Sequence, residues 1–464
     1  MSAPVLWIIL PLVLGITLLV FRDQRALALI SGFFCVFLAL AAFLLPINET
    51  ITIQKITFEL SPSLQILGRS FNLVNSDRSW LVLIFISAAF WFMASAMISV
   101  ARTLVPLGLL ITGLLTASLA VEPFLYAALI IEAAVLLSIP LLSPPGGKPN
   151  RGVLRFLIYQ TLAVPFILVA GWLLAGLDAN PGNLDLVILS VAILGLGFAL
   201  LLAVFPFYSW IPLLAGETHP FIAGFILWSF PTVGMFFGVS FLDRYAWLRE
   251  TGAVSSILVT VGILMVVTAG LFSLLQRHLG RLMGYAVMLQ NGFSFICLGL
   301  GGATMDIFLL LFLPRLVGLA LWAFSLTNLQ KYSPSLLISD LGSTAKAWTY
   351  SSMGLVVAGF SLAGLPVLAS FPYHQAIWES LARQSVSSVI WVILGCSGLI
   401  VAAIRVITAV VSSSGMDRWG VNETILQRIF IILAIISILV MGIFPSTLSA
   451  LWQRLPVLFE HIGK

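Results

Sequence analysis

The sequence predicts an all-α polytopic membrane protein with about fourteen transmembrane helices. Of its 464 residues, 61% are hydrophobic and only 8% are charged, and the mean hydropathy is +1.14. A soluble domain of this size could not cover so many apolar side chains with polar surface. Apolar runs of roughly 20 residues, the length that a helix needs to cross a bilayer, recur along nearly the whole chain. Because these runs are continuously apolar, they disfavour a membrane β-barrel.

Short polar gaps separate the runs and set the expected bounds of each helix. The first run lacks a basic region before it and a small-residue cleavage site after it, so we expect it to remain as a helix. The expected helices cover residues 4–21, 26–46, 80–100, 104–121, 123–142, 154–176, 185–205, 220–241, 253–275, 283–303, 305–328, 349–370, 386–409 and 425–447.

The basic residues predict the orientation of the chain. With the N-terminus outside, the more basic face receives Arg22, Arg25, Arg102, Lys148, Arg151, Arg155, Arg277, Arg281, Lys331, Lys346, Arg418 and Arg428. The opposite face receives Lys55, Arg69, Arg78, Arg244, Arg249, Arg383, Arg454 and Lys464. Positive residues mark cytoplasmic loops, so we expect both termini on the outer face and an even number of crossings.

Three connecting segments carry a local signal. Within the longest connection, residues 51–58 (ITIQKITF) alternate in the way typical of a short external hairpin. The Pro- and Gly-rich residues 143–152 are expected to form a plain cytoplasmic turn. Residues 451–461 are amphipathic and could lie along the membrane interface or fray.

Residues 195–220 (GLGFALLLAVFPFYSWIPLLAGETHP) predict a broken helix. An apolar helical run reaches Pro206, meets Pro212 and resumes as another apolar segment after Pro220. A break frees backbone groups from the helical hydrogen-bond ladder, and in hydrocarbon those groups must face protein or water. The sequence therefore predicts a polar cavity at this break.

A second interrupted run occupies residues 359–379 (GFSLAGLPVLASFPYHQAIWE), where Pro366 and Pro372 divide the apolar sequence. Two interrupted spans at corresponding places in two halves of a chain indicate a functional centre. The breaks lie five expected spans apart, which predicts two five-helix repeats of opposite orientation. The alternative is that the prolines only kink two helices. The expected units are residues 1–103 with the first three helices and an external loop, 104–241 as the first repeat, 253–409 as the second, inverted repeat, and 425–464 as the last helix and an amphipathic tail.

Few ionisable residues lie within the expected spans, where they are costly and usually mark a pathway or a partner. Glu132, in the middle of its span, is the clearest case: a proton-titrating or charge-coupling carboxylate, or else a neutral, hydrogen-bonded structural one. Arg315 follows a proline several residues deep and could supply a fixed positive charge or pair structurally. His374 follows the second break and could relay protons or hydrogen-bond a freed carbonyl.

The remaining polar residues in or near spans are expected to have structural roles. Arg405 lies near the cytoplasmic end of its span and is expected to snorkel. Gln160, Gln290 and Asn291 could hold water, but interhelical hydrogen bonds are the better interpretation. Every lysine falls in an expected loop or in the tail: Lys55, Lys148, Lys331, Lys346 and Lys464.

The sequence contains no nucleotide, flavin, haem or cluster motif, so we do not expect the chain to be a redox catalyst by itself. Cys35, Cys297 and Cys396 each lie singly in a different apolar run and give no metal, iron–sulfur or disulfide signal.

Four stretches, in this order, match motifs of one known family. They are residues 122–142 with Glu132 on a fifth helix, PFYSWIP at 206–212, LQRHLGRLMGY at 275–285 and SLAGLPVLASFPYH at 361–374. Together they resemble, over about residues 77–410, the antiporter-like proton-translocating membrane subunits of complex I (NADH:quinone oxidoreductase), Mrp-type cation/proton antiporters and membrane-bound hydrogenases.

The resemblance implies half-channels joined along a central line of lysines, with a glutamate–lysine pair in the first repeat and a lysine or glutamate on the second broken helix. This chain departs from that pattern at several positions. They are Leu201 for the central lysine, Tyr208 for the histidine of the first break, an eighth span from Phe221 without lysine or histidine, Arg315 near the histidine of the eleventh span, His374 for the second lysine, and Val367 and Ser370 for a proline and a glycine.

The resemblance therefore implies a membrane-arm subunit of a complex-I-like respiratory or photosynthetic redox complex, with a proton path that is degenerate in its first half. Glu132, Arg315 and His374 would form a rewired axis or be remnants. The alternatives are a purely structural bridging subunit and a subunit of an Mrp-type antiporter. A stand-alone secondary transporter ranks last, because the run before Pro206 is too apolar for a substrate site.

The same resemblance sets expectations for partners and location. Quinone, NADH or ferredoxin, flavin and iron–sulfur clusters are expected only in other subunits. Partners would be further membrane subunits, antiporter-like ones among them, and lipid, but no nucleic acid. The expected location is a prokaryotic cytoplasmic (inner) membrane or a thylakoid membrane.

Overall fold

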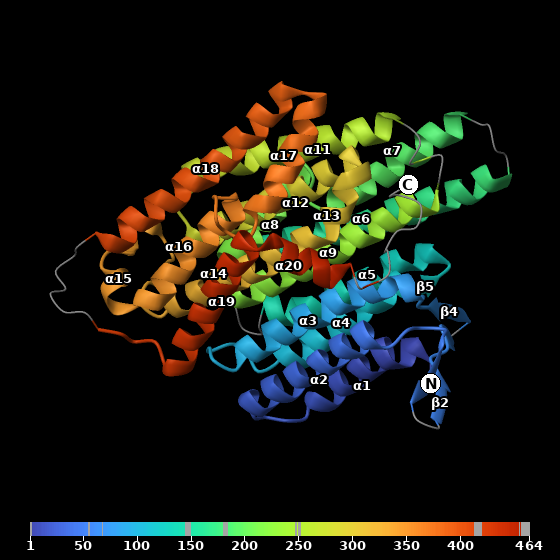
Figure 1. The fold of residues 1–464 in the computed structure, drawn as a ribbon, viewed down its shortest axis with the longest axis horizontal. Helices are drawn as coiled ribbons and strands as arrows, with labels where there is room; N and C mark the ends of the chain where they lie inside the picture. Colours follow the sequence, from blue (N-terminus) through green and yellow to red (C-terminus); the bar gives the residue numbers. More distant parts are fainter. Residues whose placement is uncertain are drawn as a thin grey trace.

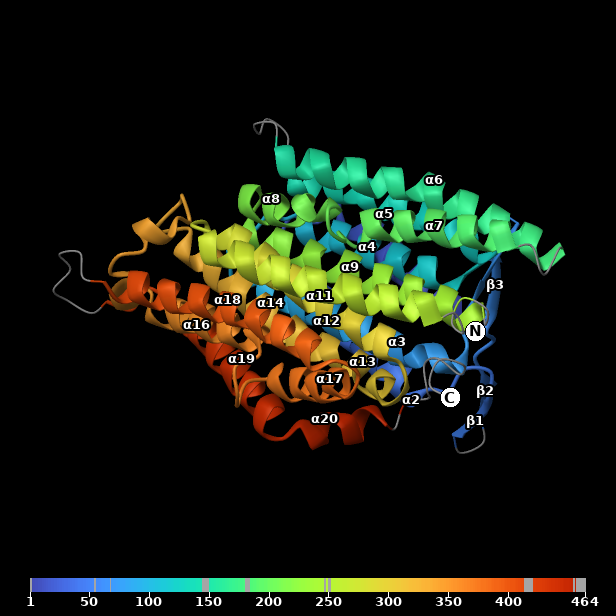
Figure 2. The ribbon, with the colours of Figure 1, turned by 90° about the horizontal axis from the view of Figure 1, so that it is seen from above.

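The computed structural model describes residues 2–53, 56–66, 68–143, 150–179, 184–245, 248, 252–412, 420–453 and 455. Within these residues, long helices run roughly parallel or antiparallel to one another and form one elongated bundle (Figure 1). Short strands lie at the end of the bundle where the N-terminus is found (Figures 1 and 2). This is the helical membrane architecture that the composition predicts.

Long α-helices dominate because a chain in hydrocarbon must satisfy its backbone hydrogen bonds internally. They are α2 (Gln24–Leu44), α3 (Arg78–Ser95), α4 (Leu104–Ala120), α5 (Ala127–Leu142), α6 (Arg151–Ala179), α7 (Leu184–Leu201), α9 (Pro220–Arg244), α11 (Gly252–Leu275), α12 (Leu279–Leu300), α14 (Phe312–Leu329), α16 (Thr349–Ala363), α18 (Val386–Val411) and α19 (Ile425–Ile443). Shorter helices are α1 (Leu10–Leu18), α8 (Trp210–Glu217), α13 (Met305–Phe308), α15 (Thr344–Ala347), α17 (Phe371–Gln384) and α20 (Pro445–Trp452). Single turns complete the set: η1 (Val5–Ile9), η2 (Asn75–Asp77), η3 (Phe124–Tyr126), η4 (Phe207–Ser209), η5 (Gly302–Thr304), η6 (Leu309–Leu311) and η7 (Ile338–Asp340).

Among the described residues, ten helical stretches are long and apolar enough to cross a membrane. Four shorter apolar helices accompany them: Val5–Leu18, Leu104–Ala120, Asp185–Leu201 and Thr349–Ala363. Every segment that the sequence predicts as a span overlaps one of these helices. The prediction of an all-α polytopic membrane protein is confirmed.

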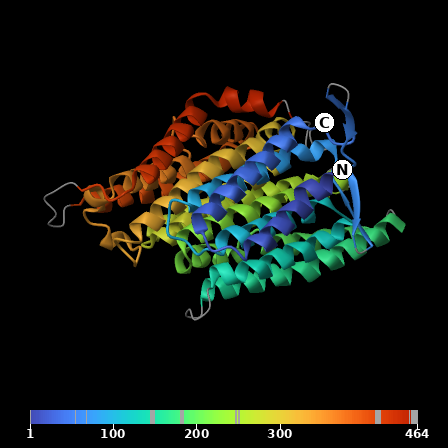
Figure 3. The same cartoon turned by 90° about the horizontal axis from the view of Figure 1, so that it is seen from below.

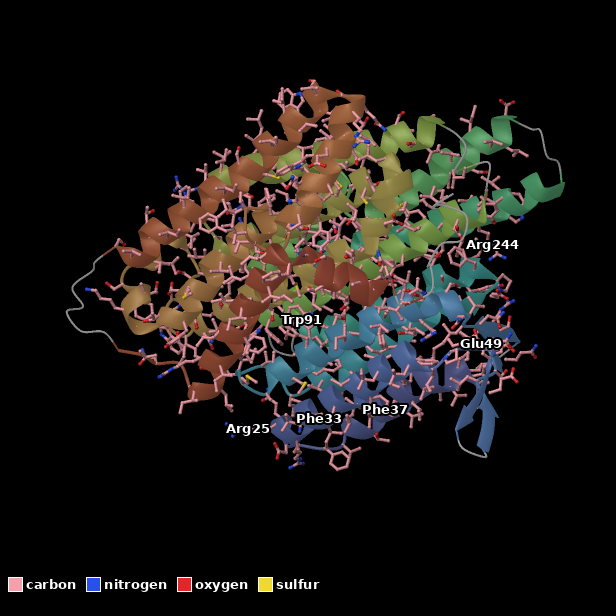
Figure 4. The ribbon with its side chains drawn as sticks, viewed as in Figure 1. Arg25, Phe33, Phe37, Glu49, Trp91 and Arg244 are labelled. Atoms are coloured by element: carbon pink, nitrogen blue, oxygen red, sulfur yellow. The ribbon has the colours of Figure 1, made fainter. Side chains whose placement is uncertain are left out.

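The helices divide into a buried centre and an exposed periphery. α9, α12 and α14 are almost wholly buried, whereas most described residues of α6, α11 and α19 are partly or fully exposed. Figures 2 and 3 place α6 at one edge of the bundle. The exposed residues of the periphery are largely apolar, as Phe33 and Phe37 on the outer side of α2 illustrate (Figure 4). Such side chains suit contact with lipid tails.

Within the described part of the chain, five short strands form two small sheets at one end of the bundle. They are β1 (Thr50–Ile53), β2 (Ile56–Glu59), β3 (Ser63–Ile66), β4 (Arg69–Asn72) and β5 (Val121–Glu122). β1 and β2 pair antiparallel, with Thr50 opposite Glu59, so the hairpin predicted over residues 51–58 is confirmed. The second sheet has the order β3-β4-β5 and ties the first long connection to the end of α4.

Some predicted features fall outside the described residues. Most of the turn predicted over residues 143–152 and most of the tail predicted over 451–461 do so, and α20 ends at Trp452. The same holds for six basic residues that contribute to the predicted orientation: Lys55, Lys148, Arg249, Arg418, Arg454 and Lys464.

Candidate functional site

The first interruption of the helical ladder lies between α7 and α8. The sequence predicts a helix that reaches Pro206, but α7 ends earlier, at Leu201. Proline has no amide hydrogen for the carbonyl of Leu202, and its ring would clash with that carbonyl in a continuous helix. Ala203 adopts a left-handed conformation, with φ of 58°. Pro212 lies in the first turn of α8, where a missing amide hydrogen costs little.

A glutamine satisfies the freed backbone at the first break. The side-chain amide of Gln160, buried on α6, donates a hydrogen bond of 3.1 Å to the carbonyl of Leu201. The space beside the break is a cavity of about 340 Å³ between α7, α9, α11 and α12, lined by apolar residues such as Phe198, Leu202 and Val204. This cavity is apolar rather than polar, and the Gln160 amide supplies the hydrogen bond that the Leu201 carbonyl needs.

The second interruption lies between α16 and α17. α16 ends at Ala363, and Gly364 follows in the left-handed conformation, with φ of 79°. A Cβ atom at Gly364 would collide with the Nδ1 atom of His374, so this helix end requires glycine. Pro366 lies in the non-helical connection, and Pro372 lies in the first turn of α17. The second break therefore repeats the order of the first: one proline between the helices and a second one opening the next helix.

A glutamine also satisfies the second break, and it reaches a titratable side chain as well. The Nε2 atom of Gln290 on α12 donates a 2.6 Å hydrogen bond to the carbonyl of Leu362 and lies 3.4 Å from His374 Nε2. His374 is fully buried and stacks on Phe293, with 3.6 Å between ring centroids. An amide nitrogen carries two hydrogens, so Gln290 can donate to both acceptors.

The contact between Gln290 and His374 is compatible with one tautomer of the neutral ring. When Nε2 accepts a hydrogen bond, the neutral ring carries its proton on Nδ1. The Nδ1 atom has no hydrogen-bond partner among the described residues. His374 thus offers a proton-bearing nitrogen on one side and a fixed, hydrogen-bonded nitrogen on the other.

Arg315 is buried in the centre of the bundle on α14. Pro231 inside α9 has no amide hydrogen for the carbonyl of Leu227, one turn earlier, and the Nη2 atom of Arg315 lies 3.4 Å from that free carbonyl. The Nε and Nη1 atoms have no partner among the described residues. Burying a guanidinium costs free energy when few hydrogen bonds replace its hydration. This cost favours water or another polar group beside Arg315.

Glu132 has a different setting from the one that its position in the sequence predicts. It lies on α5 beside the exposed residues Leu129 and Leu136 and is only half-buried. The hydroxyl of Thr161, an exposed residue of α6, donates a 2.6 Å hydrogen bond to its Oε1 atom. The midpoint of a span sets the depth of a residue but not the side of the helix that it occupies, and Glu132 lies toward the surface.

The three ionisable candidates are not joined to one another. Glu132, Arg315 and His374 lie on α5, α14 and α17, and no hydrogen bond or ion pair links any two of them in the part of the chain that the structure describes. The structure instead groups His374 with Gln290 at the second break.

The other polar predictions have mixed outcomes. Gln160 and Gln290 form the predicted interhelical hydrogen bonds, whereas the side chain of Asn291 is fully buried with no partner among the described residues. Arg405 on α18 donates from Nη1 to the carbonyl of Leu274 in the last turn of α11. That contact is a structural cap, because cations stabilise helix C-termini.

α8, which follows the first break, packs closely against α12, the helix that carries Gln290 of the second break. Gly280 and Gly284 form a G-x-x-x-G pair on α12, and a Cβ atom at Gly284 would lie 2.7 Å from the Cα atom of Pro212. His278 accepts hydrogen bonds from the first amides of α12. Burial, and then the neighbouring Arg281 charge, lower the pKa of His278, which keeps the ring neutral for this role. α12 therefore packs on α8 at one end and carries Gln290 further along.

Sequence reasoning missed a buried polar junction between α3, α14, α16 and α19. It contains Glu423, which accepts a hydrogen bond of 2.9 Å from the backbone N–H of Ser351. Gln427 donates to Asn328 Oδ1 at 3.2 Å and to the carbonyl of Met97 at 2.7 Å. The T-x-x-Q capping box at Thr424 marks this helix start in the sequence. Nothing in the sequence indicates that Gln427, in the first turn of α19, lies against Asn328 of α14.

Within the described residues, no cluster of three or more histidine, cysteine, aspartate or glutamate side chains could hold a metal ion. Cys35, Cys297 and Cys396 are buried and unpaired.

Comparisons with known proteins agree with this geometry. A family model described as "NADH:quinone oxidoreductase/Mrp antiporter, TM" matches residues 172–401, a range that includes both breaks. The chloroplastic NAD(P)H-quinone oxidoreductase chain 4 of Mesostigma viride is 23% identical over 359 residues, which are 68% of this chain and 68% of that protein.

Two solved structures share the fold. A chain of respiratory complex I from Thermus thermophilus with bound NADH superposes with a TM-score of 0.77 and 20% identity over 99% of this chain and 100% of its own. A chain of the membrane-bound sulfane sulfur reductase, an archaeal respiratory membrane complex, gives a TM-score of 0.80 and 16% identity over 98% and 97%. The family that the four sequence motifs predict is thereby confirmed. The chain belongs to the antiporter-like membrane subunit family of complex I, Mrp antiporters and membrane-bound hydrogenase-like complexes.

Proposed function

We propose that this chain is a membrane-arm subunit of a complex-I-like respiratory or photosynthetic redox complex and contributes to proton translocation coupled to electron transfer. The observation that carries the proposal is the second break, where His374, a fully buried titratable ring, shares Gln290 with the freed carbonyl of Leu362. Buried ionisable groups at helix interruptions mark proton and ion paths in membrane proteins.

The proposed architecture has about fourteen crossings and two inverted five-helix repeats, each with one broken helix. The same spacing separates Pro206 from Pro212 and Pro366 from Pro372, and a glutamine holds the last-turn carbonyl at each break. Ten long and four shorter apolar helices among the described residues are compatible with that number of crossings.

The proposed path runs through the second half of the chain. Leu201 occupies the position where the family pattern has its central lysine, and leucine can neither carry a charge nor accept a proton. The apolar lining of the cavity beside the first break supports this assignment. Arg315 would supply fixed positive charge, and Glu132, near the surface of α5, would couple to a neighbouring subunit.

The chain would depend on other subunits for its chemistry. We propose that quinone, NADH or ferredoxin, flavin and iron–sulfur clusters are bound there, and that further antiporter-like subunits lie beside this one. The proposed location is a prokaryotic inner membrane or a thylakoid membrane, with both termini outside. Arg25 at one end of the bundle and Glu49 and Arg244 at the other (Figure 4) are compatible with that orientation.

A purely structural bridging role is the second candidate. It is favoured by Leu201 at the first break and by the lack of any link between Glu132, Arg315 and His374 among the described residues. A subunit of an Mrp-type antiporter is a further alternative, because the matching family model covers both kinds of complex.

One experiment separates the first two candidates. The assembled complex is reconstituted in liposomes with Glu132→Gln or His374→Ala, and protons translocated per electron are measured. We expect His374→Ala to lower this ratio while electron transfer continues. The matched controls are Glu379→Gln and Gln375→Ala, at two exposed residues of α17 that hydrogen-bond to each other. An unchanged ratio in both test variants would leave only the structural role.

A further inference from the structure

The cavity beside the first break opens to the side of the bundle. α7 packs mainly on α6, and α11 packs mainly on α12 and α18, so the cavity lies between α7 and α11 in the part of the chain that the structure describes. Figure 2 shows these two helices next to each other on the same side of the bundle. Ala192 and Gly195 on α7 and Ile257 on α11 line the cavity and are also exposed. They mark its opening.

The lining of this cavity is apolar throughout. Its residues come from α7, α9, α11, α12 and Leu248, and every one is glycine or has an apolar side chain. An ordered water molecule needs polar partners, which these side chains do not offer. Protein interiors contain few voids larger than a water molecule, because an empty cavity forfeits packing energy. The cavity therefore suits an apolar occupant that enters from the side.

The cavity is long and follows the direction of the helices. On α7 its lining extends from Val191 to Leu202, which corresponds to about 16 Å of helix. On α11 it begins at Val254, close to the helix end at the predicted outer face, and at the first break it includes Val204. One leaflet contributes about 15 Å of hydrocarbon, half of a core about 30 Å thick. The cavity thus matches the depth of one leaflet.

The surroundings of the opening favour lipid as the occupant. Ile188 and Leu189 on α7 and Leu264 on α11 are exposed apolar side chains, which suit contact with lipid tails. The back wall is formed by Met235 on α9 and Phe295 on α12, which are only 1% and 6% exposed. A helix of another subunit, about 10 Å wide, could cover the opening, but its rigid backbone could not reach this wall. A flexible hydrocarbon chain can.

We propose that one acyl chain of an outer-leaflet phospholipid enters between α7 and α11 and fills this cavity as far as the first break. The headgroup stays at the outer membrane surface, and the end of the chain lies near Leu202 and Val204. The lipid completes the packing of the half of the protein in which Leu201 occupies the position of the family's central lysine. This inference is independent of the proposed proton translocation.

Photolabelling tests the site in the assembled complex. The complex is reconstituted in phosphatidylcholine vesicles in which part of the lipid carries a diazirine near the end of one acyl chain, and labelled residues are mapped by mass spectrometry. Met235 and Phe236 are a matched pair, because they are neighbours on α9 and each is 1% exposed, but only Met235 lines the cavity. We expect at least about tenfold more label on Met235, because a carbene reacts only with atoms that the chain contacts.

A block at the opening sharpens the test. A Cβ atom at Gly195 would meet no atom within 4 Å, so Gly195→Leu can fill the opening without displacing other residues. We expect this variant to lose most of the label on Met235. Gly252→Leu is the matched control, because its Cβ would also meet no atom within 4 Å and Gly252 does not line the cavity. The exposed Leu264 should be labelled equally in all three proteins.

Three results would overturn the proposal. The first is label on Leu264 with no more on Met235 than on Phe236, which would mean that no chain enters or that a neighbouring subunit seals the opening. The second is undiminished labelling of Met235 in Gly195→Leu. The third is a selective loss of label from Met235 when an isoprenoid quinone is added to the vesicles, which would assign the cavity to an isoprenoid chain instead. Labelling needs no electron transfer, so failure of the proposed function would leave these results unchanged.

Discussion

The two breaks have the same backbone design and different chemistry. In each, a helix ends before a proline, a second proline opens the next helix, and a buried glutamine from a neighbouring helix donates to a last-turn carbonyl. At the first break Gln160 donates only that bond within the described residues, its Oε1 atom is buried without a partner there, and an apolar cavity lies beside it. Gln290 also reaches His374 at the second break, where Ser361 and Arg315 have unpartnered polar atoms.

The comparison distinguishes two requirements: the hydrogen bond that an interrupted membrane helix needs, and the groups that proton transfer needs. A freed carbonyl requires one hydrogen-bond donor, and an uncharged amide supplies it. Proton transfer requires in addition a titratable group and polar neighbours that hold water. The first break has an uncharged amide and an apolar cavity beside it, whereas the second also has the buried imidazole of His374.

The largest expected effect comes from restoring the lysine of the family pattern at the first break. We expect Leu201→Lys to destabilise the protein by about 2.5–3.5 kcal/mol, because it puts a charge into the bundle without an acidic partner. Thermal unfolding of the purified complex measures the loss, with Leu201→Met as a control of similar volume. A stable Leu201→Lys variant with a raised proton-to-electron ratio would mean that the first break has kept a working path.

A smaller effect is expected from removing the two glutamines. Gln160→Leu and Gln290→Leu each leave a buried carbonyl unpaired, which costs about 1–3 kcal/mol. We expect similar losses of thermal stability in both, but a lowered proton-to-electron ratio only in Gln290→Leu. The exposed Gln375→Leu controls for the substitution itself. Equal effects of both changes on pumping would remove the distinction between the breaks.

The smallest of these effects concerns the helix ends. Gly364→Ala should cost at least about 1–2 kcal/mol, because alanine resists the left-handed conformation and its methyl group would push against His374. Gly195→Ala on α7 is the control, since its Cβ would meet no atom within 4 Å and alanine favours a helix interior by about 0.5–1 kcal/mol. A neutral Gly364→Ala would show that the second helix end is less constrained than its geometry indicates.

The sequence was sufficient for the spans, the hairpin and the family, because hydropathy, alternation and motifs are local properties. It misplaced the helix ends at Leu201 and Ala363, since a proline acts on the carbonyl four residues earlier and a left-handed glycine ends a helix before its proline. It also took Pro212 and Pro372 as part of the breaks, although both lie in first turns of helices, where proline is tolerated.

The partners of polar residues could not be predicted, because tertiary packing chooses them. Nothing in the sequence joins Gln290 to His374 or Glu423 to Ser351, since each pair is separated by more than seventy residues. The side of the helix on which Glu132 lies could not be predicted either: it is half-buried beside the exposed Leu129 and Leu136, and its Oε2 atom is buried without a partner among the described residues. The lysine pattern was more reliable, because Lys331 and Lys346 lie outside the long helices, while the other three lysines fall outside the described residues.

The most direct test of the difference between the breaks is the number of protons translocated per electron by the reconstituted complex carrying either His374→Ala or Tyr208→Phe. These residues occupy one position at each break where the family pattern has a basic side chain, as Leu201 also does at the first break. We expect a lowered ratio with His374→Ala and an unchanged ratio with Tyr208→Phe, at equal electron-transfer rates. A lowered ratio with Tyr208→Phe and a normal one with His374→Ala would contradict it and return the proton path to the first break.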